Sequence, residues 1–512
     1  MRPRWLDSPR VLFALSALLA LVALASQFRL DLPSREVEPA SALLELRERD
    51  DLNVVFLVVD TLRADRLGAY GYERPTSTVL DELARYGILF EDVVAQSSWT
   101  KTSMASLWTG TLPMRHGVLR YDHVLPDEAR MPAEILREAG LRTIGLWRNG
   151  WVEPNFGFAQ GFDLYMRPVV GAERMRVHRE ARTVTPIAGT DEDLTLAALD
   201  FLERFGRERF FLYLHYMDVH QYAYDERAAI FGTSYSDAYD QSIHWVDRLI
   251  GVLLARLEEL DLLSRTLVVI ASDHGEAFLE HGYEGHARNL YDEVTRVPWI
   301  VLPPFLLDPG VRVERTVANV DIWPTLLDLL GLPALPDADG RSQLPAILAA
   351  AEGRSEVAEP RSVFAQLERG WGRPRAENLP TLVSVTRDGK RLITALGASR
   401  PAELYDRRRD PAEQDDLAAR DPDWAAPLRE ELEAYRAATE SPWGRAPHAV
   451  ELDELRLNHL RALGYAVRPD PLPETDEAAG SEDPSSRQPA PESPNRSRSA
   501  PSPGSTSTTR SP

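Results

Sequence analysis

Three side chains that can bind metal ions follow two stretches predicted to be buried strands. Asp60 comes directly after the apolar run at 53–59, and Asp273 and His274 come just after the run at 266–271. In an open α/β sheet, groups at the carboxyl ends of the strands meet at one edge, where ligands bind. A lone aspartate there is more often a turn or cap residue, whereas Asp273-His274 is better explained by function. We expect a divalent-cation site, in which an imidazole ligand favours Zn²⁺ or Mn²⁺ and leaves Ca²⁺ and Mg²⁺ open.

Thr100 carries a hydroxyl that such a cation would help to deprotonate. It lies just ahead of a predicted helix at 103–108, and the N-terminus of a helix favours a bound anion. An unactivated alcohol is a weak nucleophile, so a contact with the metal is what this chemistry requires. Taken alone, Thr100 would be interpreted as a helix cap.

The elements that must position these groups alternate between strands and helices. Continuous apolar, β-branched runs predict buried parallel strands at 53–59, 142–146, 210–215 and 266–271. Helices are predicted at 191–206, which has an acidic first turn, and at 236–260, which has an apolar stripe. This alternation predicts an α/β fold with a large, mostly parallel sheet flanked by helices.

Composition excludes several kinds of partner and site. The 512 residues carry a formal net charge of −21, which offers no basic surface for nucleic acid. The chain has no cysteine, so disulfides, iron–sulfur clusters and thiolate metal sites are excluded. A hydrophobic content of 44% is that of a globular protein with an ample core.

The N-terminus is predicted to direct export. A basic flank precedes the apolar run at 11–25, which is short for a full membrane span and ends in the small-x-small sequence Ala23-Leu24-Ala25. Residues 1–26 are therefore a cleaved signal peptide or a single membrane anchor, and 27–50 are predicted to form a charged stalk. In both cases we expect a periplasmic or otherwise extracytoplasmic protein, which contacts the membrane through this segment if it is uncleaved.

The rest of the chain divides by composition. We assign 51–332 to a catalytic domain and 333–380, rich in Pro, Ala and charge, to a connector. An Asp-Gly pair between two alternating runs predicts a β-hairpin, and with an acidic helix after it this indicates a small α+β lobe at 381–466. Residues 467–512 have no aromatic side chain and are predicted to be disordered.

Together these segments resemble the sulfatase branch of the alkaline phosphatase superfamily. The resemblance covers roughly residues 52 to 440 in the expected order. It rests on the stretches 59–71, 109–110, 116–117, 272–276, 280–282, 285–286, 291–293, 296–298, 320–331, 403–406 and 410–417.

The resemblance implies a role for each residue of the predicted metal site. Asp60, Asp273 and His274 match metal ligands, and Thr100 matches the nucleophile that touches the metal. Thr100 would attack the sulfur or phosphorus of an ester and form a covalent intermediate, which water or an acceptor alcohol then releases.

Five further residues are candidates for the site, three of them through the same resemblance. His286 matches a position that contacts the substrate or assists the leaving group, and Asp218 and His220 fall where the family brings further polar groups to the site. In relatives with two metals such groups help to hold the second ion, whereas His220 is equally compatible with a hydrogen-bonded loop histidine. Lys101 and Arg63 are candidates for binding the ester oxygens, although surface or structural roles fit them as well.

The sequence also departs from the family pattern. Without cysteine, the aldehyde that sulfatases make from that residue cannot form, and Thr100 stands in its place. Thr61 replaces a second Asp, His274 replaces an Asn or Gln, and Thr102 and Met104 replace a Pro and an Arg. A threonine with such a metal resembles the phosphodiesterases, phosphonate hydrolases and phosphoglycol or phosphoethanolamine transferases of the superfamily.

We therefore predict a metal-dependent hydrolase of sulfate or phosphate esters that acts on a small-molecule, glycan or lipid ester. One alternative is a transferase that decorates an envelope glycan or lipid, although such transferases usually carry several membrane spans. The other is an inactive binding protein of the same fold, which would be expected to lose at least one predicted metal ligand.

Overall fold

The computed structural model describes most of the chain between residues 36 and 468. The described ranges are 36–168, 174–177, 184–187, 189–224, 230–354, 361–373, 379–397, 401–454, 457, 460 and 467–468. The predicted signal or anchor segment at 1–26 lies outside the described residues, as do the first part of the predicted stalk and nearly all of the predicted tail. Within the described ranges, no helix is both long and apolar enough to cross a membrane.

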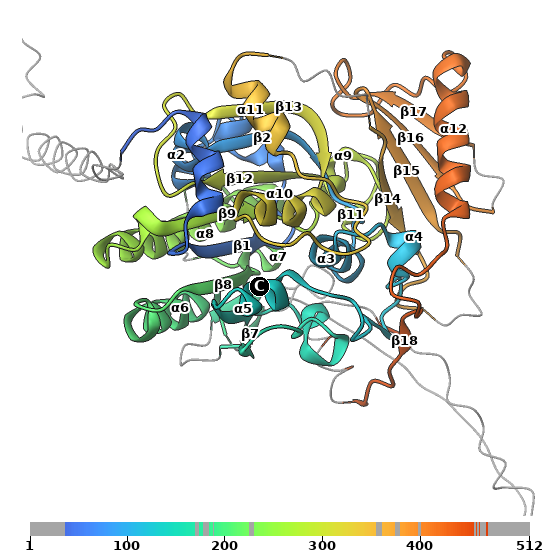
Figure 1. Cartoon of the computed structure of the whole chain (residues 1–512). Helices are drawn as coiled ribbons and strands as arrows, with labels where there is room; N and C mark the ends of the chain where they lie inside the picture. The colour runs from blue at the N-terminus through green and yellow to red at the C-terminus, as the bar shows by residue number, and fades with distance from the viewer. Residues whose placement is uncertain are drawn as a thin grey trace, which may run out of the picture. The chain divides into compact units, whose positions relative to one another are not determined.

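An eight-stranded sheet forms the centre of the fold (Figure 1). In spatial order it contains β13 (Val311–Ala318), β2 (Ile88–Val94), β12 (Arg296–Leu302), β9 (Thr266–Ala271), β1 (Asn53–Val59), β8 (Phe210–Tyr216), β4 (Arg142–Trp147) and β5 (Leu164–Met166). The pairs β1–β8, β1–β9, β4–β8, β4–β5 and β13–β2 are parallel, and β12 is antiparallel to both of its neighbours. The predicted α/β fold with a mostly parallel sheet is confirmed.

The apolar run of β1 is continuous because both faces of the sheet are covered. Val54, Phe56 and Val58 belong to one hydrophobic core, whereas Val55 and Leu57 belong to the other. Successive side chains of a strand point to opposite faces, so a strand in the middle layer needs apolar residues at every position.

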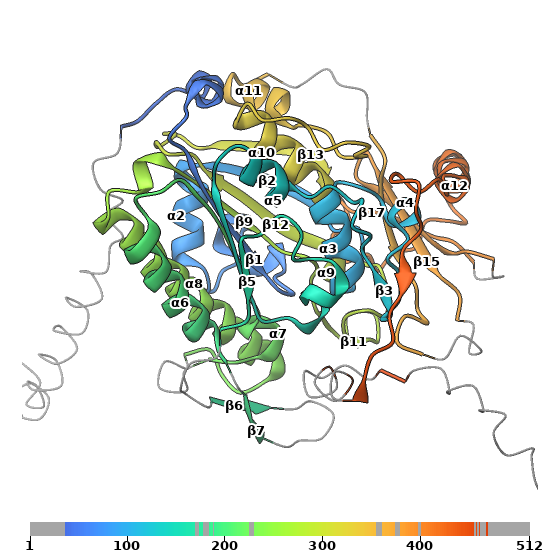
Figure 2. The same cartoon turned by 60° about the horizontal axis from the view of Figure 1, so that its bottom comes forward.

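Helices cover each face of the sheet (Figure 2). On one face lie α2 (Thr78–Tyr86), α6 (Asp191–Phe205) and α8 (Tyr235–Glu259). On the other face lie α3 (Thr100–Thr109), α5 (Pro132–Glu138), α10 (Ile322–Leu329) and α11 (Leu344–Ala351). Capping boxes at Thr190 and Ser234 begin α6 and α8, the two helices predicted at 191–206 and 236–260.

A smaller antiparallel sheet forms the C-terminal lobe. Its order is β14 (Val363–Leu367), β15 (Leu382–Arg387), β16 (Lys390–Ala395) and β17 (Glu403–Asp406), and α12 (Pro422–Ala437) packs on it. Asp388 and Gly389 connect β15 to β16 with φ angles of 53° and 77°, as the short hairpin turn requires. The predicted Asp-Gly hairpin is confirmed.

Two segments have more structure than the sequence predicts. Within the predicted stalk, a 3₁₀ helix, η2 (Ala40–Glu48), buries Leu43 and Leu46 in the core of the main domain. Within the predicted connector, α11 packs on the same core and β14 forms an edge of the small sheet. The composition of the two segments did not indicate this structure, because short elements that pack on an existing surface need only a few apolar residues.

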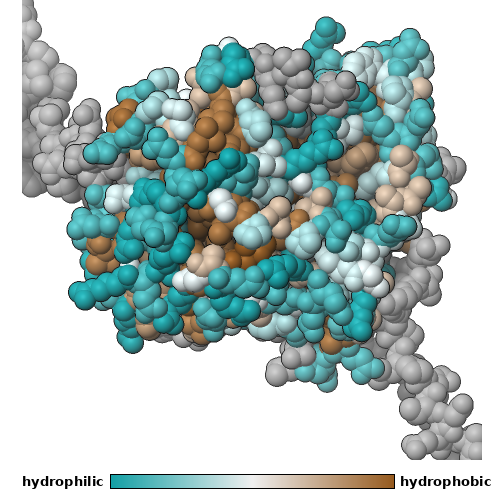
Figure 3. Space-filling view, viewed as in Figure 1, coloured by the Kyte–Doolittle hydropathy of each residue, from teal (hydrophilic) through white to brown (hydrophobic). Residues whose placement is uncertain are grey.

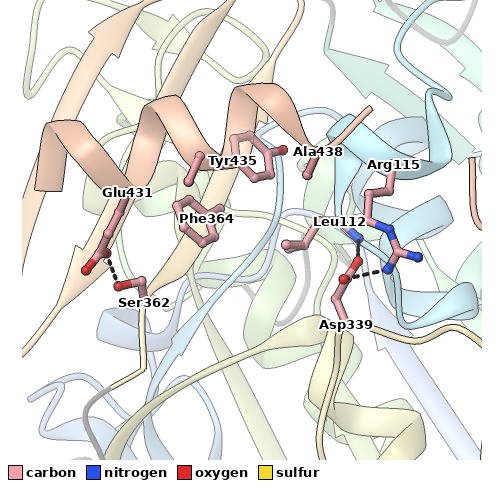
Figure 4. Close-up of a pocket in the computed structure, with 9 residues that line it drawn as sticks. Leu112, Arg115, Asp339, Ser362, Phe364, Glu431, Tyr435 and Ala438 are labelled. Atoms are coloured by element: carbon pink, nitrogen blue, oxygen red, sulfur yellow. Dashed lines mark hydrogen bonds and ion pairs between the residues drawn. The ribbon is translucent and has the colours of Figure 1, made fainter. Parts of the chain in front are cut away.

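A cavity of about 290 Å³ lies between α12, β14 and α4 (Pro113–His116) (Figure 4). Its apolar wall includes Phe364 and Tyr435, whose rings stack at 4.7 Å. Its polar side chains pair with one another, Arg115 with Asp339 and Ser362 with Glu431. None of the predicted site residues lines the cavity.

The space-filling view in Figure 3 shows the face drawn in Figure 1 as mostly hydrophilic, with hydrophobic side chains gathered near its middle.

Candidate functional site

The three residues predicted as metal ligands meet at the carboxyl edge of the large sheet. Asp60 follows β1, and Asp273 and His274 follow β9, which is the parallel neighbour of β1. Each of the three offers one ligand atom, and these atoms all lie within 4.8 Å of one another. All three residues are completely buried. Adjacent parallel strands therefore deliver two carboxylates and an imidazole to one enclosed point.

Each carboxylate of this cluster has one oxygen that accepts hydrogen bonds from the protein and one that accepts none. Asp60 Oδ2 accepts hydrogen bonds from the Asn149 amide and from His215 Nε2 at 3.2 Å. Asp273 Oδ1 accepts from the backbone N–H of Thr61 at 3.2 Å and of His274 at 2.9 Å. Asp60 Oδ1 and Asp273 Oδ2 are buried and accept no hydrogen bond. Buried oxygens of this kind are normally paired, so the arrangement suits a cation.

The hydrogen bonds of His274 determine which of its ring nitrogens is free. Nδ1 lies 3.0 Å from the carbonyl oxygen of Gly275, which can only accept, so Nδ1 carries the proton. In the neutral ring Nε2 then has a free lone pair. Nε2 lies 3.0 Å from Thr100 Oγ1 and 3.3 Å from Asp273 Oδ2. His274 can therefore bind a cation or accept the hydroxyl proton of Thr100.

Thr100 lies at the beginning of α3 and is completely buried beside this cluster. Ser103, in the first turn of the same helix, donates a hydrogen bond to the carbonyl oxygen of Asp273 at 2.6 Å. This bond fastens the helix to the loop after β9. The positive end of the α3 dipole faces the point where Thr100 and the cluster meet, which favours negative charge there.

The turn after β1 is strained. Thr61, a β-branched residue, has a φ of 60°, in the left-handed region that such residues rarely adopt. Its backbone N–H donates to Asp273, and its carbonyl accepts from the hydroxyl of Tyr239 at 2.7 Å. These bonds stabilise the turn and keep Asp60 at the strand end. Strain of this kind is common at functional sites.

Two further histidines lie beside the cluster, as the sequence predicts. The ring of His286 lies 4.6 Å from that of His274 and 5.0 Å from that of His220. Burial lowers the pKa of His220 to about 3, so its ring is neutral near pH 7. Burial also acts to lower the pKa of His286, but the Glu276 carboxylate, 3.4 Å from Nδ1, outweighs it and raises the pKa. His286 is therefore the better proton donor of the two.

Arg63 holds the loop that carries His286 and is not directed at the metal cluster. Its guanidinium donates to Asp65, to Glu280 and to the carbonyl oxygen of Glu276. Glu280 lies between β10 (Ala277–Phe278) and β11 (Glu284–Gly285), whose hairpin leads into His286. Arg63 is already paired with two carboxylates. The structure therefore favours a structural role for this residue over binding of the ester oxygens.

His281 fastens the same hairpin to the C-terminal lobe. Nδ1 lies 2.9 Å from a carboxylate oxygen of Glu293, Nε2 lies 2.9 Å from the carbonyl oxygen of Glu413, and the ring stacks on Tyr291. Burial acts to lower the pKa of His281, but the hydrogen bonds to Glu293 and Glu413 outweigh it and raise the pKa to about 9.

This shift predicts a pH-dependent contribution to stability. A pKa raised above the ordinary value of about 6.5 stabilises the fold fully below that pH, and the contribution is lost as the pH rises through about 9. His281→Gln should therefore lower the free energy of unfolding more at about pH 6 than at about pH 9.5. Urea unfolding of both proteins at the two pH values measures the difference. An equal loss at both values would show that His281 is neutral in the fold.

Lys101 follows Thr100 in α3 but points elsewhere. Its Nζ donates to the carbonyl oxygen of Tyr121 at 2.6 Å and lies 3.3 Å from the centre of the Phe156 ring. Successive residues of a helix point about 100° apart, so a helix that directs Thr100 to the metal cluster directs Lys101 into the neighbouring wall. Burial lowers the pKa of Lys101 well below its usual range. The structure does not bring Lys101 to the cluster.

Asp218 belongs to a buried ion cluster behind the site. Its carboxylate accepts from Arg148, from the Trp245 indole and from the backbone of Asp191. Arg148 also donates to the Asp191 carboxylate at 2.6 Å, and that carboxylate caps the backbone N–H groups that begin α7 (Asp218–Gln221). The structure thus uses Asp218 to hold the chain near His220 and does not place it in the metal cluster.

The structure adds residues to the site that the sequence did not identify. Asn149 and His215 hold Asp60. Asn149 lies two residues after the end of β4, and His215 lies in β8 next to its last residue. Both positions are at the carboxyl edge of the predicted sheet, which is the signal that could have identified them.

Sequence comparison supports the likeness that the motifs indicated. The sulfatase family model matches residues 52–332, and a model described as N-sulphoglucosamine sulphohydrolase, C-terminal, matches residues 279–438. The steryl-sulfatase of Rattus norvegicus is 34% identical over 178 residues, which are 32% of this chain and 31% of that protein. The N-acetylgalactosamine-6-sulfatase of Canis lupus familiaris is 27% identical over 345 residues, or 58% of this chain and 66% of that protein. The chain thus spans less than two thirds of the length of these curated relatives.

Solved structures share the fold. A sulfatase structure from Bacteroides thetaiotaomicron has a TM-score of 0.62 at 19% identity and covers 79% of this chain and 96% of that one. A 2-O glycosaminoglycan sulfatase has a TM-score of 0.61 at 18% identity and covers 78% and 95%. At these identities the likeness is one of architecture alone. The family match, however, covers more than half of the 512 residues, and the protein belongs to the sulfatase family.

Proposed function

We propose that the protein is a metal-dependent hydrolase of sulfate esters in which Thr100 is the nucleophile. Membership of the sulfatase family supports the reaction class. The observation that carries the proposal is the position of Thr100, with its hydroxyl 3.0 Å from His274 Nε2, at the beginning of a helix and beside two carboxylates.

The residues of the cluster fit a divalent cation. Asp60 Oδ1 and Asp273 Oδ2 accept no hydrogen bond, although both are buried. Burial and the neighbouring Asp60 carboxylate raise the pKa of Asp273, which is the expected cost of two buried acids without a counter-charge. Asp60, Asp273, His274 and Thr100 would hold the ion with three oxygens and one nitrogen. This mixed set favours Zn²⁺ or Mn²⁺, with Ca²⁺ and Mg²⁺ as the other options. When bound, such an ion neutralises charge on the ester oxygens and promotes ionisation of a hydroxyl.

The residues around the cluster have distinct roles in the proposed reaction. Thr100 Oγ1 attacks sulfur and gives up its proton to solvent, because Nε2 of His274, its one free nitrogen, would be held by the ion. The bond between sulfur and the alcohol oxygen breaks, and His286, held by Glu276, donates the proton that the departing alkoxide needs. Water then attacks the sulfur carried by Thr100 and gives a proton to His286; the bond between sulfur and Oγ1 breaks, sulfate leaves, and Thr100 regains its proton from solvent. His220, neutral because its pKa is depressed, contributes packing and polarity beside His286.

A panel of matched esters tests the reaction class. The full chain, loaded with Zn²⁺ or Mn²⁺, is assayed with an aryl sulfate, a phosphate monoester, a phosphodiester and a phosphonate ester that share one leaving group. We expect metal-dependent turnover of the sulfate ester that EDTA abolishes. Turnover of the phosphorus esters alone would overturn the sulfate assignment and place the protein with the threonine-dependent phosphodiesterases.

The natural substrate in this proposal is a small-molecule or glycan sulfate met outside the cytoplasm. One structural relative is described as a glycosaminoglycan sulfatase, and another was solved with a neocarrahexaose. The apolar run at 11–25 supports the extracytoplasmic location. Fractionation of cells that express the full chain tests this location, because a cytosolic protein would contradict it.

A further inference from the structure

Asn149 connects the predicted nucleophile to a predicted metal ligand. It follows β4, and its amide Nδ2 donates to Asp60 Oδ2 and lies 3.4 Å from Thr100 Oγ1. The strand order β1-β8-β4 separates Asn149 from Asp60 by one intervening strand. A single amide group thus touches two functional side chains that come from different elements.

The chemistry of this amide determines the direction of the Thr100 hydroxyl. Nδ2 has two protons and no lone pair to offer, so it can only donate. With one proton directed at Asp60 and the other at Thr100, the Thr100 oxygen acts as an acceptor toward Asn149. The hydroxyl proton is then directed at His274 Nε2, 3.0 Å away, as long as that nitrogen holds no cation.

The surroundings of Asn149 hold this amide in place. Its Oδ1 accepts from the backbone N–H of Trp151 at 2.8 Å, which caps the 3₁₀ turn η5 (Gly150–Val152) and distinguishes the oxygen side of the amide from the nitrogen side. Its neighbour Arg148 is bound to the carboxylates of Asp191 and Asp218. Both Asn149 and Arg148 are buried. A side chain fixed on both sides can position a reacting group within a few tenths of an ångström.

We propose that Asn149 is a positioning residue that fixes the Thr100 oxygen beside the cluster and holds the Asp60 carboxylate for the cation. This inference rests on the proposed function, since it assigns Asn149 a role toward the same nucleophile and the same ion. It also separates two roles of one side chain. The oxygen of the amide caps η5, and the nitrogen serves the site.

Asn149→Asp removes the nitrogen donor and keeps the oxygen, and it also adds a negative charge. Aspartate keeps the shape of the side chain and the oxygen that caps Trp151, but it has no N–H to donate. We expect kcat to fall 10- to 100-fold with KM within about threefold of the native value, the usual effect of removing a residue that orients a metal ligand. Asn155→Asp makes the same change in the following turn, on a residue without a hydrogen bond to Asp60 or Thr100, and should leave kcat unchanged.

Asn149→Ala tests the link to the metal without adding a charge. We expect Mn²⁺ binding, followed by electron paramagnetic resonance of the full chain without substrate, to weaken 10- to 100-fold. Native kcat in Asn149→Asp, or native Mn²⁺ affinity in Asn149→Ala, would overturn the inference and leave Asn149 as a cap of η5 only. The proposed function is tested by a different variant, Thr100→Ala. Full activity of Thr100→Ala would contradict the proposed function, whatever the Asn149 variants show.

Discussion

Thr100→Ala is expected to lower kcat toward sulfate esters by about 10³-fold or more, because the variant has no atom that can form the covalent bond to sulfur. Removing the nucleophile of an enzyme that uses a covalent intermediate usually costs several orders of magnitude, with the remaining rate coming from the rest of the site. Initial rates with an aryl sulfate, at saturating metal, measure this loss. Mass spectrometry of the quenched native enzyme should also show a sulfated Thr100 peptide.

The matched control for this change is Thr100→Ser. Serine keeps the hydroxyl beside His274 and removes only a methyl group, so kcat should remain within about tenfold of the native value. Both variants should keep the native melting temperature within a few degrees, because Thr100 is the first residue of α3 and its hydroxyl hydrogen-bonds to His274 and Asn149 within the site. Native activity in Thr100→Ala would mean that water or another group attacks the ester.

Asp60→Asn is expected to abolish turnover and to weaken Mn²⁺ or Zn²⁺ binding by at least about 100-fold. The amide keeps an oxygen that can accept from Asn149 and His215, but the group that faces Asp273 loses its charge. A neutral ligand gains much less from a divalent cation in a buried site. Calorimetric titration of the metal-free protein measures the affinity, and the same sample gives the rate.

The stability of the metal-free protein separates this explanation from simple unfolding. Burial and the Asp60 charge raise the pKa of Asp273, and Asp60→Asn relieves that repulsion. Burial also acts to raise the pKa of Asp60, but His220 and His215 outweigh it and lower the pKa, so the variant loses this stabilisation as well. The two effects oppose each other, and the metal-free melting temperature should stay within a few degrees of the native value. Added metal should stabilise the native protein and not the variant. Asp51→Asn, at the amino end of β1, is the matched control and should keep both metal binding and turnover. Native metal affinity in Asp60→Asn would refute the assignment of the cluster.

The fold was predictable to the extent that it depends on local patterns. A continuous apolar run indicates a strand buried on both faces, and an apolar stripe indicates a helix buried on one. The structure confirms the elements predicted in this way, which are the strands β1, β4, β8 and β9 and the helix α8. The strands β2, β12 and β13 were not predicted, nor was β5. β13 alternates apolar with polar residues at the edge of the sheet, β2 is interrupted by Glu91 and Asp92, and β5 is a short edge strand, so their patterns are weaker.

The sequence by itself determined the class of the fold and the three residues, Asp60, Asp273 and His274, that meet at the carboxyl edge of the sheet. Asp60, Asp273 and His274 directly follow strands, so their position in space follows from the topology of a parallel sheet. The tertiary structure decided which polar side chains near these residues reach the cluster. Lys101 and Asp218 are close to site residues along the chain, but the first points into the wall beside Phe156 and the second is bound to Arg148. Asn149 reaches Asp60 and Thr100 across the sheet. The direction of a side chain depends on the backbone dihedrals of its own turn and on long-range partners, and neither can be read from residue type or spacing.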